Sequence, residues 1–122
     1  MTIKNIAIRF NKILISLLSQ LSDLIGVKYY NKIKRISKIN YLLPLKYSVK
    51  FFNNYQEKIM NKDELFFLNE ELNKSSLNDD SLNEILKLKK IYYKIDNQSK
   101  ENLWLNLQAL TLLSNDYYCL AY

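Results

Sequence analysis

The chain of 122 residues contains no histidine, and it has one glycine, one proline and one cysteine. The absence of histidine excludes Ser-His triads, Cys-His dyads and zinc sites with imidazole ligands. Cys119 alone makes neither a Cys-x-x-Cys motif nor an intrachain disulfide, and Gly26 alone excludes glycine-rich phosphate loops. We therefore expect a protein that is not an enzyme and that uses no cofactor and no small-molecule substrate.

Paired carboxylates are the remaining candidates for a chemical site, at Glu70-Glu71 and Asp79-Asp80. Such pairs can bind a divalent cation or act in acid–base catalysis. Adjacent acids in a polar stretch before a helix are more often solvated charges that the helix dipole favours. We interpret them as solvated charges and predict no metal site.

The size and composition are those of a globular protein. Hydrophobic residues make up 48% and charged residues 25% of the chain, so we predict a single helical domain over residues 1–122. The N-terminal stretch carries Lys4, Arg9 and Lys12 and has the look of a transit peptide, but its apolar run "ILISLL" is too short to span a bilayer. We expect neither mitochondrial targeting nor a membrane partner, and the single cysteine indicates a reducing compartment.

Hydrophobic periodicity predicts helices along most of the chain. Apolar residues recur at steps of three and four, Gly26 stops the first helix, Pro44 fits the first turn of the third, and Ser81 with Glu84 forms a capping box before the fourth. The scarcity of glycine argues against tight β-hairpins. We predict an all-α bundle of four to five helices at residues 3–25, 27–40, 44–61, 82–95 and 103–113.

The last of these helices is apolar on nearly every side, and it holds Trp104, the only tryptophan. A helix that is hydrophobic all round packs against several neighbours. We predict that it is the central helix of the bundle, with Asp96 or Ser99 as its N-cap. The segment at residues 116–122 is interpreted as a tail that either folds back onto the bundle or extends from it.

Positive charge is concentrated in the first half of the chain. Residues 1–50 contain ten Lys or Arg against one acid, Asp23, although the formal net charge of the whole chain is only +6. The stretch "KYYNKIKRISK" combines cations, which can neutralise phosphates, with tyrosines, which can stack on unpaired bases. It predicts a candidate nucleic-acid site, which consists of Lys28, Tyr29, Tyr30, Lys32, Lys34, Arg35 and Lys38. Its alternative interpretation is a solvated helix face with tyrosines at the core edge, in a chain whose lysine excess is compositional.

The C-terminal sequence "NDYYCLAY" is short and apolar. Its tyrosines either pack at the edge of the core or form an exposed patch for a protein partner. The second interpretation gives a candidate partner interface at Tyr117, Tyr118, Leu120 and Tyr122.

Three segments of the sequence are distinctive: "NKDELFFLN", "LNEILKLKKIYYKI" and "SKENLWLNLQALTLLS", with an N-K-D-E-x-F-F-L motif at residues 61–68 and a K-E-N-x-W motif at residues 100–104. They resemble segments of a family of small helical proteins of nucleocytoplasmic large DNA viruses. The similarity extends over residues 10–114. It implies a helical protein made in an infected cell or packaged in a virion, and it implies no activity and no functional residues. The tail and the basic second helix depart from the family pattern.

The sequence favours a non-enzymatic structural or protein-interaction protein, such as a giant-virus virion component or assembly adaptor in the virion or host cytoplasm. The expected partner is another protein or a second copy of the chain. The alternative function is a nucleic-acid-binding module that uses the basic second helix.

Overall fold

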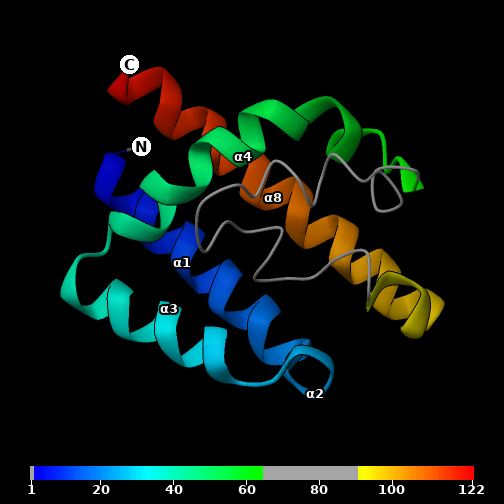
Figure 1. Ribbon diagram of the computed structural model, residues 1–122. Helices are drawn as coiled ribbons and strands as arrows, with labels where there is room; N and C mark the ends of the chain where they lie inside the picture. Colours follow the sequence, from blue (N-terminus) through cyan, green and yellow to red (C-terminus); the bar gives the residue numbers. More distant parts are fainter. Residues whose placement is uncertain (1, 65–90) are drawn as a thin grey trace.

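The computed structural model describes residues 2–64 and 91–122, which form an all-α bundle (Figure 1). The elements are α1 (Ile3–Gln20), α2 (Ser22–Ile25), α3 (Lys28–Ile39), α4 (Leu43–Met60), the 3-10 helix η2 (Tyr92–Lys94) and α8 (Asn97–Ala121). These two ranges contain no β-strand. The predicted fold class is confirmed.

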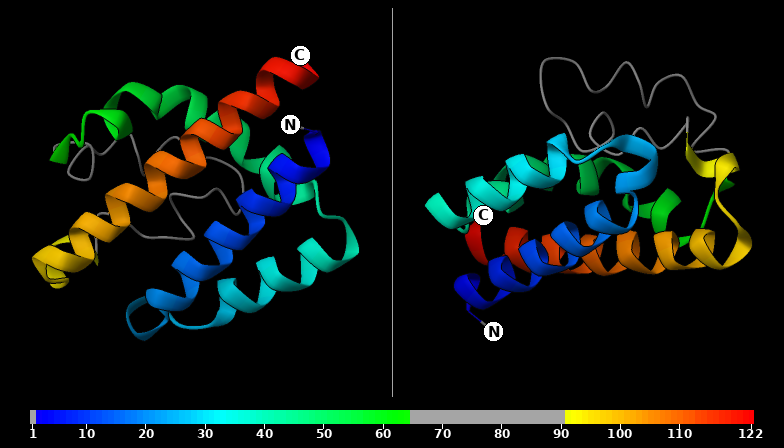
Figure 2. Two further views of the ribbon diagram at one scale, coloured as in Figure 1. Left: turned by 180° about the vertical axis from the view of Figure 1, so that it is seen from behind. Right: turned by 90° about the horizontal axis from the view of Figure 1, so that it is seen from below.

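The helices α1 and α8 lie side by side and run in opposite directions, so the two chain ends meet at one end of the bundle (Figures 1 and 2). The helix α4 packs across α8, and α3 packs against α1 and α4 at the edge of the bundle. Phe10 of α1 and Phe52 of α4 are fully buried and meet edge to face, with ring centroids 5.9 Å apart. This geometry is favourable for aromatic pairs, and it ties the two helices together at the core.

The predicted first helix, residues 3–25, is divided at Leu21 into α1 and the single turn α2. The hydroxyl of Ser22 donates to the carbonyl of Ser19 over 2.8 Å, so a serine side chain occupies a backbone acceptor at this point. Serine can compete with helical hydrogen bonding in this way, and this bond lies at the break. Gly26 ends α2 with a φ of 82°, a conformation that favours glycine, so the predicted stop is confirmed.

The second and third helices agree with the prediction to within one residue at each end. Pro44 lies in the first turn of α4, where its missing N–H group is not needed. The turn before it is built on Asn40, whose side-chain oxygen accepts from the backbone N–H of Leu42 over 3.0 Å. Most of the predicted fourth helix lies outside the described residues, and its described end is the 3-10 helix η2 followed by extended backbone at Ile95.

The helix α8 is the longest described element, and its position between α1 and α4 confirms the prediction of a central helix. Only one side of it is buried, although its apolar residues lie on nearly every side: Leu105 and Leu112 are 54% and 53% exposed. The extended alternative for residues 116–122 is also wrong, because α8 continues to Ala121 and Tyr117 packs in the core. The buried side consists of Leu103, Trp104, Leu107, Leu110, Thr111, Ser114 and Tyr117.

Candidate nucleic-acid interface

The packing of α3 determines which of its basic residues are exposed to solvent. Ile33 is buried against the core, and the opposite side of the helix faces solvent. Four cations lie exposed on that solvent side, at Lys28, Lys34, Arg35 and Lys38. At 1.5 Å per residue they are spread over about 15 Å of helix. Lys32 is half-buried, so it stands apart from this exposed set, which we call the basic face.

The basic face contains no acid. The residues of α3 include no Asp or Glu, and Asp23 is the single acid in residues 2–56. Within the described parts of the chain, none of the four cations has a carboxylate at ion-pair distance; the ion pair of Lys62 with Glu101, at 2.7 Å, lies on other elements. The acids Glu70, Glu71, Asp79 and Asp80 lie outside the described residues. Among the described residues, no carboxylate therefore neutralises the positive charge of the basic face.

Tyr29 and Tyr30 are not open stacking platforms, which corrects the prediction. Both are half-buried and pack against the hydrophobic core. The ammonium group of Lys28 lies 5.8 Å from the ring centroid of Tyr29, and that of Lys34 lies 5.6 Å from the ring centroid of Tyr30. These cation–π contacts occupy ring faces that a base would need.

The turn between α3 and α4 presents apolar side chains that the sequence analysis missed. Ile39 is 77% exposed, Tyr47 71% and Tyr41 40%. Tyr47 lies on the outer side of α4 beside the exposed Lys46 and Lys50, because Leu45, Val49 and Phe52 occupy the buried side. The position of Tyr47 between two lysines is the signal that could have found it. We call Ile39, Tyr41, Tyr47 and these two lysines the α3–α4 corner.

Of the four residues of the predicted C-terminal interface, one is buried in the structure and three are exposed. Tyr117 is 3% exposed, so it belongs to the core and not to an interface. Burial raises the pKa of its hydroxyl, and a hydrogen bond with Tyr122 acts in the same direction. Tyr118, Leu120 and Tyr122 remain exposed at the end of α8. The rings of Tyr118 and Tyr122 contact each other, with centroids 5.1 Å apart.

Tyr92 and Trp104 form the polar centre of the core. The indole Nε1 of Trp104 donates to the hydroxyl of Tyr92 over 3.2 Å, and that hydroxyl donates to Oε1 of Glu64 over 2.9 Å. Burial raises the pKa of Tyr92, and the bond to Glu64 raises it further, against the opposing effect of Trp104. Each group has its partner, so the arrangement is structural and Trp104 belongs to the core of the bundle, as the sequence predicted.

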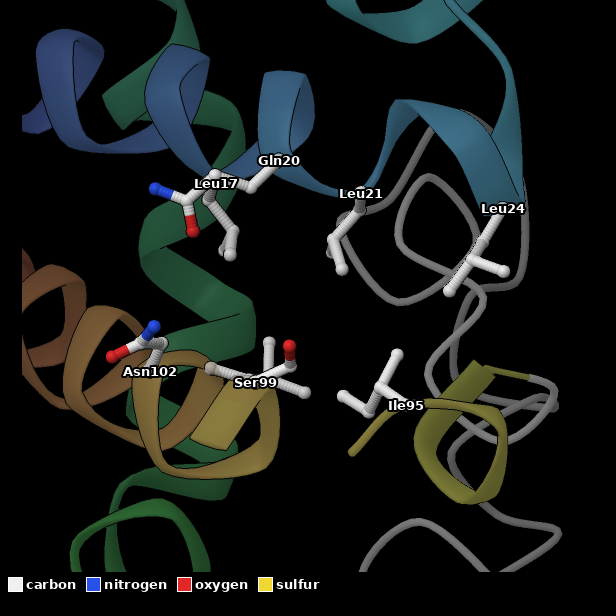
Figure 3. Close-up of a pocket in the computed structure, with 8 residues that line it drawn as sticks. Leu17, Gln20, Leu21, Leu24, Ile95, Ser99 and Asn102 are labelled. Carbon is white, nitrogen blue, oxygen red and sulfur yellow. The ribbon is translucent and has the colours of Figure 1, made fainter. Parts of the chain in front are cut away.

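A small pocket lies between the end of α1, the turn α2 and the start of α8 (Figure 3). Its volume is about 70 Å³, well below the roughly 300–1,000 Å³ of ligand sites. Figure 3 shows leucines on one wall, and Ile95, Ser99 and Asn102 on the other. The lining has no titratable side chain, so this pocket offers no acid–base chemistry.

The described residues show two further absences. Within residues 2–64 and 91–122, no cluster of three or more His, Cys, Asp or Glu side chains is placed to hold a metal ion. None of the helices in these same ranges combines the length and the hydropathy needed to cross a membrane.

Comparison of the chain with models of protein families, with curated proteins and with solved structures finds no match. The resemblance to the viral family therefore stays a prediction. The function has to be argued from the geometry of the chain itself.

Proposed function

We propose that this protein is a non-enzymatic nucleic-acid-binding protein whose binding surface is the basic face of α3. The observation that carries the proposal is the exposure of Lys28, Lys34, Arg35 and Lys38 on one side of a helix that has no acid. Phosphate groups supply the affinity of such contacts. The shape of the molecule supports the proposal, since α3 lies at the edge of the bundle and its outer side is free of the other described helices (Figures 1 and 2).

The surrounding charge extends the favourable field beyond the basic face. Residues 2–56 carry the ten basic residues of α1, α3 and the first turns of α4, against Asp23. Most of the described acids lie on other elements, at the end of α4, near η2 and at the start of α8. A field of one sign on one part of a surface steers a polyanion to that part and raises the association rate.

The expected affinity depends strongly on salt. Four phosphate contacts predict a slope of about −3.6 for log K against log salt concentration on duplex DNA, and about −2.8 on a single strand. Between about 50 and 200 mM salt the affinity for a duplex then falls by about two orders of magnitude. Binding of this kind reads the backbone and carries no sequence preference.

The test compares two variants that lower the net charge by the same amount. Lys34→Glu with Lys38→Glu removes two cations from the basic face, and Lys58→Glu with Lys94→Glu removes two from elsewhere. Fluorescence anisotropy with labelled duplex and single-stranded DNA and RNA measures the affinity at both salt concentrations. We expect the first variant to lose binding and the second to keep most of it. Equal losses, or binding that salt does not change, would contradict the proposal.

We propose as a second candidate function an interaction protein, including the virion component or assembly adaptor that the viral resemblance implies. The observation in its favour is the exposed end of α8, where the rings of Tyr118 and Tyr122 contact each other and Leu120 is also exposed. Exposed aromatic and aliphatic groups of this kind mark protein interfaces when they are contiguous.

Leu120→Asp is the variant that tests this second function, because truncation after Asn115 would also remove the buried Tyr117. Light scattering after size-exclusion chromatography measures the mass of the assembly. A self-association that Leu120→Asp abolishes, and that Leu105→Asp on the same helix leaves intact, would support an interface at the chain end. If the wild-type protein is a monomer at every concentration, its function does not involve self-association.

A further inference from the structure

We infer that the nucleic acid is single-stranded, and that Tyr41 and Tyr47 at the α3–α4 corner stack on its bases. This inference rests on the proposed function, and it names both the partner class and a second part of the site. Proteins that bind single strands combine a positive surface along the backbone with aromatic rings on which the bases stack. The basic face provides the first component, and the α3–α4 corner provides the second.

The chemistry of the corner matches unpaired bases. Tyr47 and Tyr41 offer ring surface to solvent, and Ile39 at the end of α3 adds exposed apolar surface. Lys46 and Lys50 flank Tyr47 on α4, and Lys38 is the last cation of α3 before the turn. Residues 38–50 contain no acid. A phosphate backbone that follows α3 therefore reaches exposed aromatic rings where the helix ends.

Duplex bases do not fit this surface, because their faces are already stacked on one another and are closed to a side chain. A tyrosine on the outside of a helix, such as Tyr47, can meet the sugar-phosphate backbone or the base edges of a duplex, but not the faces of its bases. Rings with exposed faces thus contribute to single-strand binding and add little to duplex binding. The contrast with Tyr29 and Tyr30 is direct, since those rings are half-buried and covered by lysine ammonium groups.

The backbone of the corner is fixed before any ligand arrives. The carbonyl of Asn40 accepts from the N–H of Leu43 over 3.2 Å, and the carbonyl of Tyr41 accepts from the side-chain amide of Asn11 over 2.8 Å. Asn11 is itself buried in α1. The Tyr41 backbone is thus held from both sides, and a tyrosine side chain has only two torsions to order on binding. Such preorganisation lowers the entropic cost of binding.

The experiment uses the full chain and three fluorescent probes: a mixed-sequence single strand of about 20 nucleotides, its duplex, and an abasic strand of the same length. The variants are Tyr41→Ala with Tyr47→Ala, the ring-preserving Tyr47→Phe, and Tyr122→Ala as a control that removes an equally exposed ring from the C-terminus. Circular dichroism shows whether each variant keeps its helices.

We expect the double alanine variant to bind the single strand at least about tenfold more weakly, and to bind the duplex and the abasic strand within about twofold of the wild type. Tyr47→Phe and Tyr122→Ala should retain wild-type affinity for the single strand.

An equal loss on all three probes, or no loss on the single strand, would overturn the stacking proposal and leave the basic face in place. Wild-type protein that binds none of the probes would overturn the proposed function itself. If the two tyrosines are needed for binding to phosphatidylserine vesicles and not to the strand, the corner binds lipid and the proposal is wrong.

Discussion

The side-chain amide of Asn11 in α1 donates a hydrogen bond of 2.8 Å to the backbone carbonyl of Tyr41, thirty residues away in the chain. Asn11 is 6% exposed, and its own Oδ1 atom has no hydrogen-bond partner among the described residues. An unpaired amide oxygen in the core costs free energy, and the bond from the same side chain to Tyr41 offsets part of that cost. That bond connects the core to the α3–α4 corner.

Replacement of Asn11 by alanine removes the donor and leaves the Tyr41 carbonyl without its side-chain partner. We expect the free energy of unfolding to fall by about 1–3 kcal/mol, as for other buried hydrogen bonds. Urea unfolding followed by circular dichroism measures this change. Asn5→Ala on the exposed side of the same helix is the matched control and should change stability by less than about 0.5 kcal/mol. If Asn11→Ala is as mild as Asn5→Ala, the bond does not stabilise the corner.

A leucine-to-alanine substitution should lower the stability of the protein much more on the buried side of α8 than on its exposed side. Leu107 is fully buried between α1 and α4, whereas Leu112 is 53% exposed. Leu107→Ala leaves a cavity in the core and should cost about 2–5 kcal/mol. Leu112→Ala should cost less than about 0.5 kcal/mol in the isolated chain. A large loss at Leu112 in urea unfolding would show that this side of α8 is covered in the folded protein.

Local chemistry explains which features the sequence could predict. Gly26 and Pro44 act through their own backbone geometry, and Asp96 acts on a group three residues away, so each marks a helix end without reference to the rest of the fold. The apolar spacing of residues 103–113 is also a local pattern, and it indicated a helix at the centre of the bundle. These signals were sufficient for the fold class.

Features that depend on tertiary contacts were beyond the sequence. A tyrosine is both apolar and polar, so its residue type does not say whether Tyr30 packs inward or Tyr47 outward. Tyr117 is buried because α8 continues past Asn115 and packs along α1, which the polar residues at that point do not indicate. The bond from Asn11 to Tyr41 joins residues that no local pattern connects. The basic cluster of α3 was predicted, and the exposure of Tyr41 and Tyr47 was not.

The N-cap of α8 predicts a change of stability at acid pH. Oδ1 of Asp96 accepts from the backbone N–H of Ser99 over 2.7 Å, and this bond lowers the pKa of the carboxyl group. Because the pKa is lower in the folded chain than in the unfolded chain, the stabilisation is present above the unfolded pKa of about 3.9 and is lost as the pH falls through the folded value.

We expect Asp96→Ala to lower the urea midpoint at neutral pH, and Asp96→Asn to retain most of the cap because its side-chain oxygen also accepts. The asparagine variant should lack the part of the acid response that belongs to Asp96. Urea midpoints for the three proteins between about pH 2 and 7 measure both effects. Identical acid profiles for the wild type and Asp96→Asn would contradict the assignment of the lowered pKa to this cap.

The buried hydroxyl of Tyr92 predicts a loss of stability at alkaline pH. Burial and the bond to Glu64 raise its pKa above the ordinary value of about 10. The folded chain then holds the Tyr92 proton more tightly than the unfolded chain does. Its contribution is fully present below the unfolded pKa and is lost as the pH rises from that value through the folded one.

Tyr92→Phe removes this titration together with the acceptor of the Trp104 indole N–H. We expect it to cost about 1–3 kcal/mol at neutral pH, because a buried donor loses its partner. The difference in stability between the variant and the wild type should narrow between about pH 9 and 11, since the wild type loses the Tyr92 contribution there. Tyr93→Phe, at the exposed neighbouring ring, is the control and should follow the wild type. A constant difference across this pH range would mean that the hydroxyl of Tyr92 titrates alike in the folded and unfolded chains, and that its hydrogen bonds to Trp104 and Glu64 stabilise the core without shifting its ionisation.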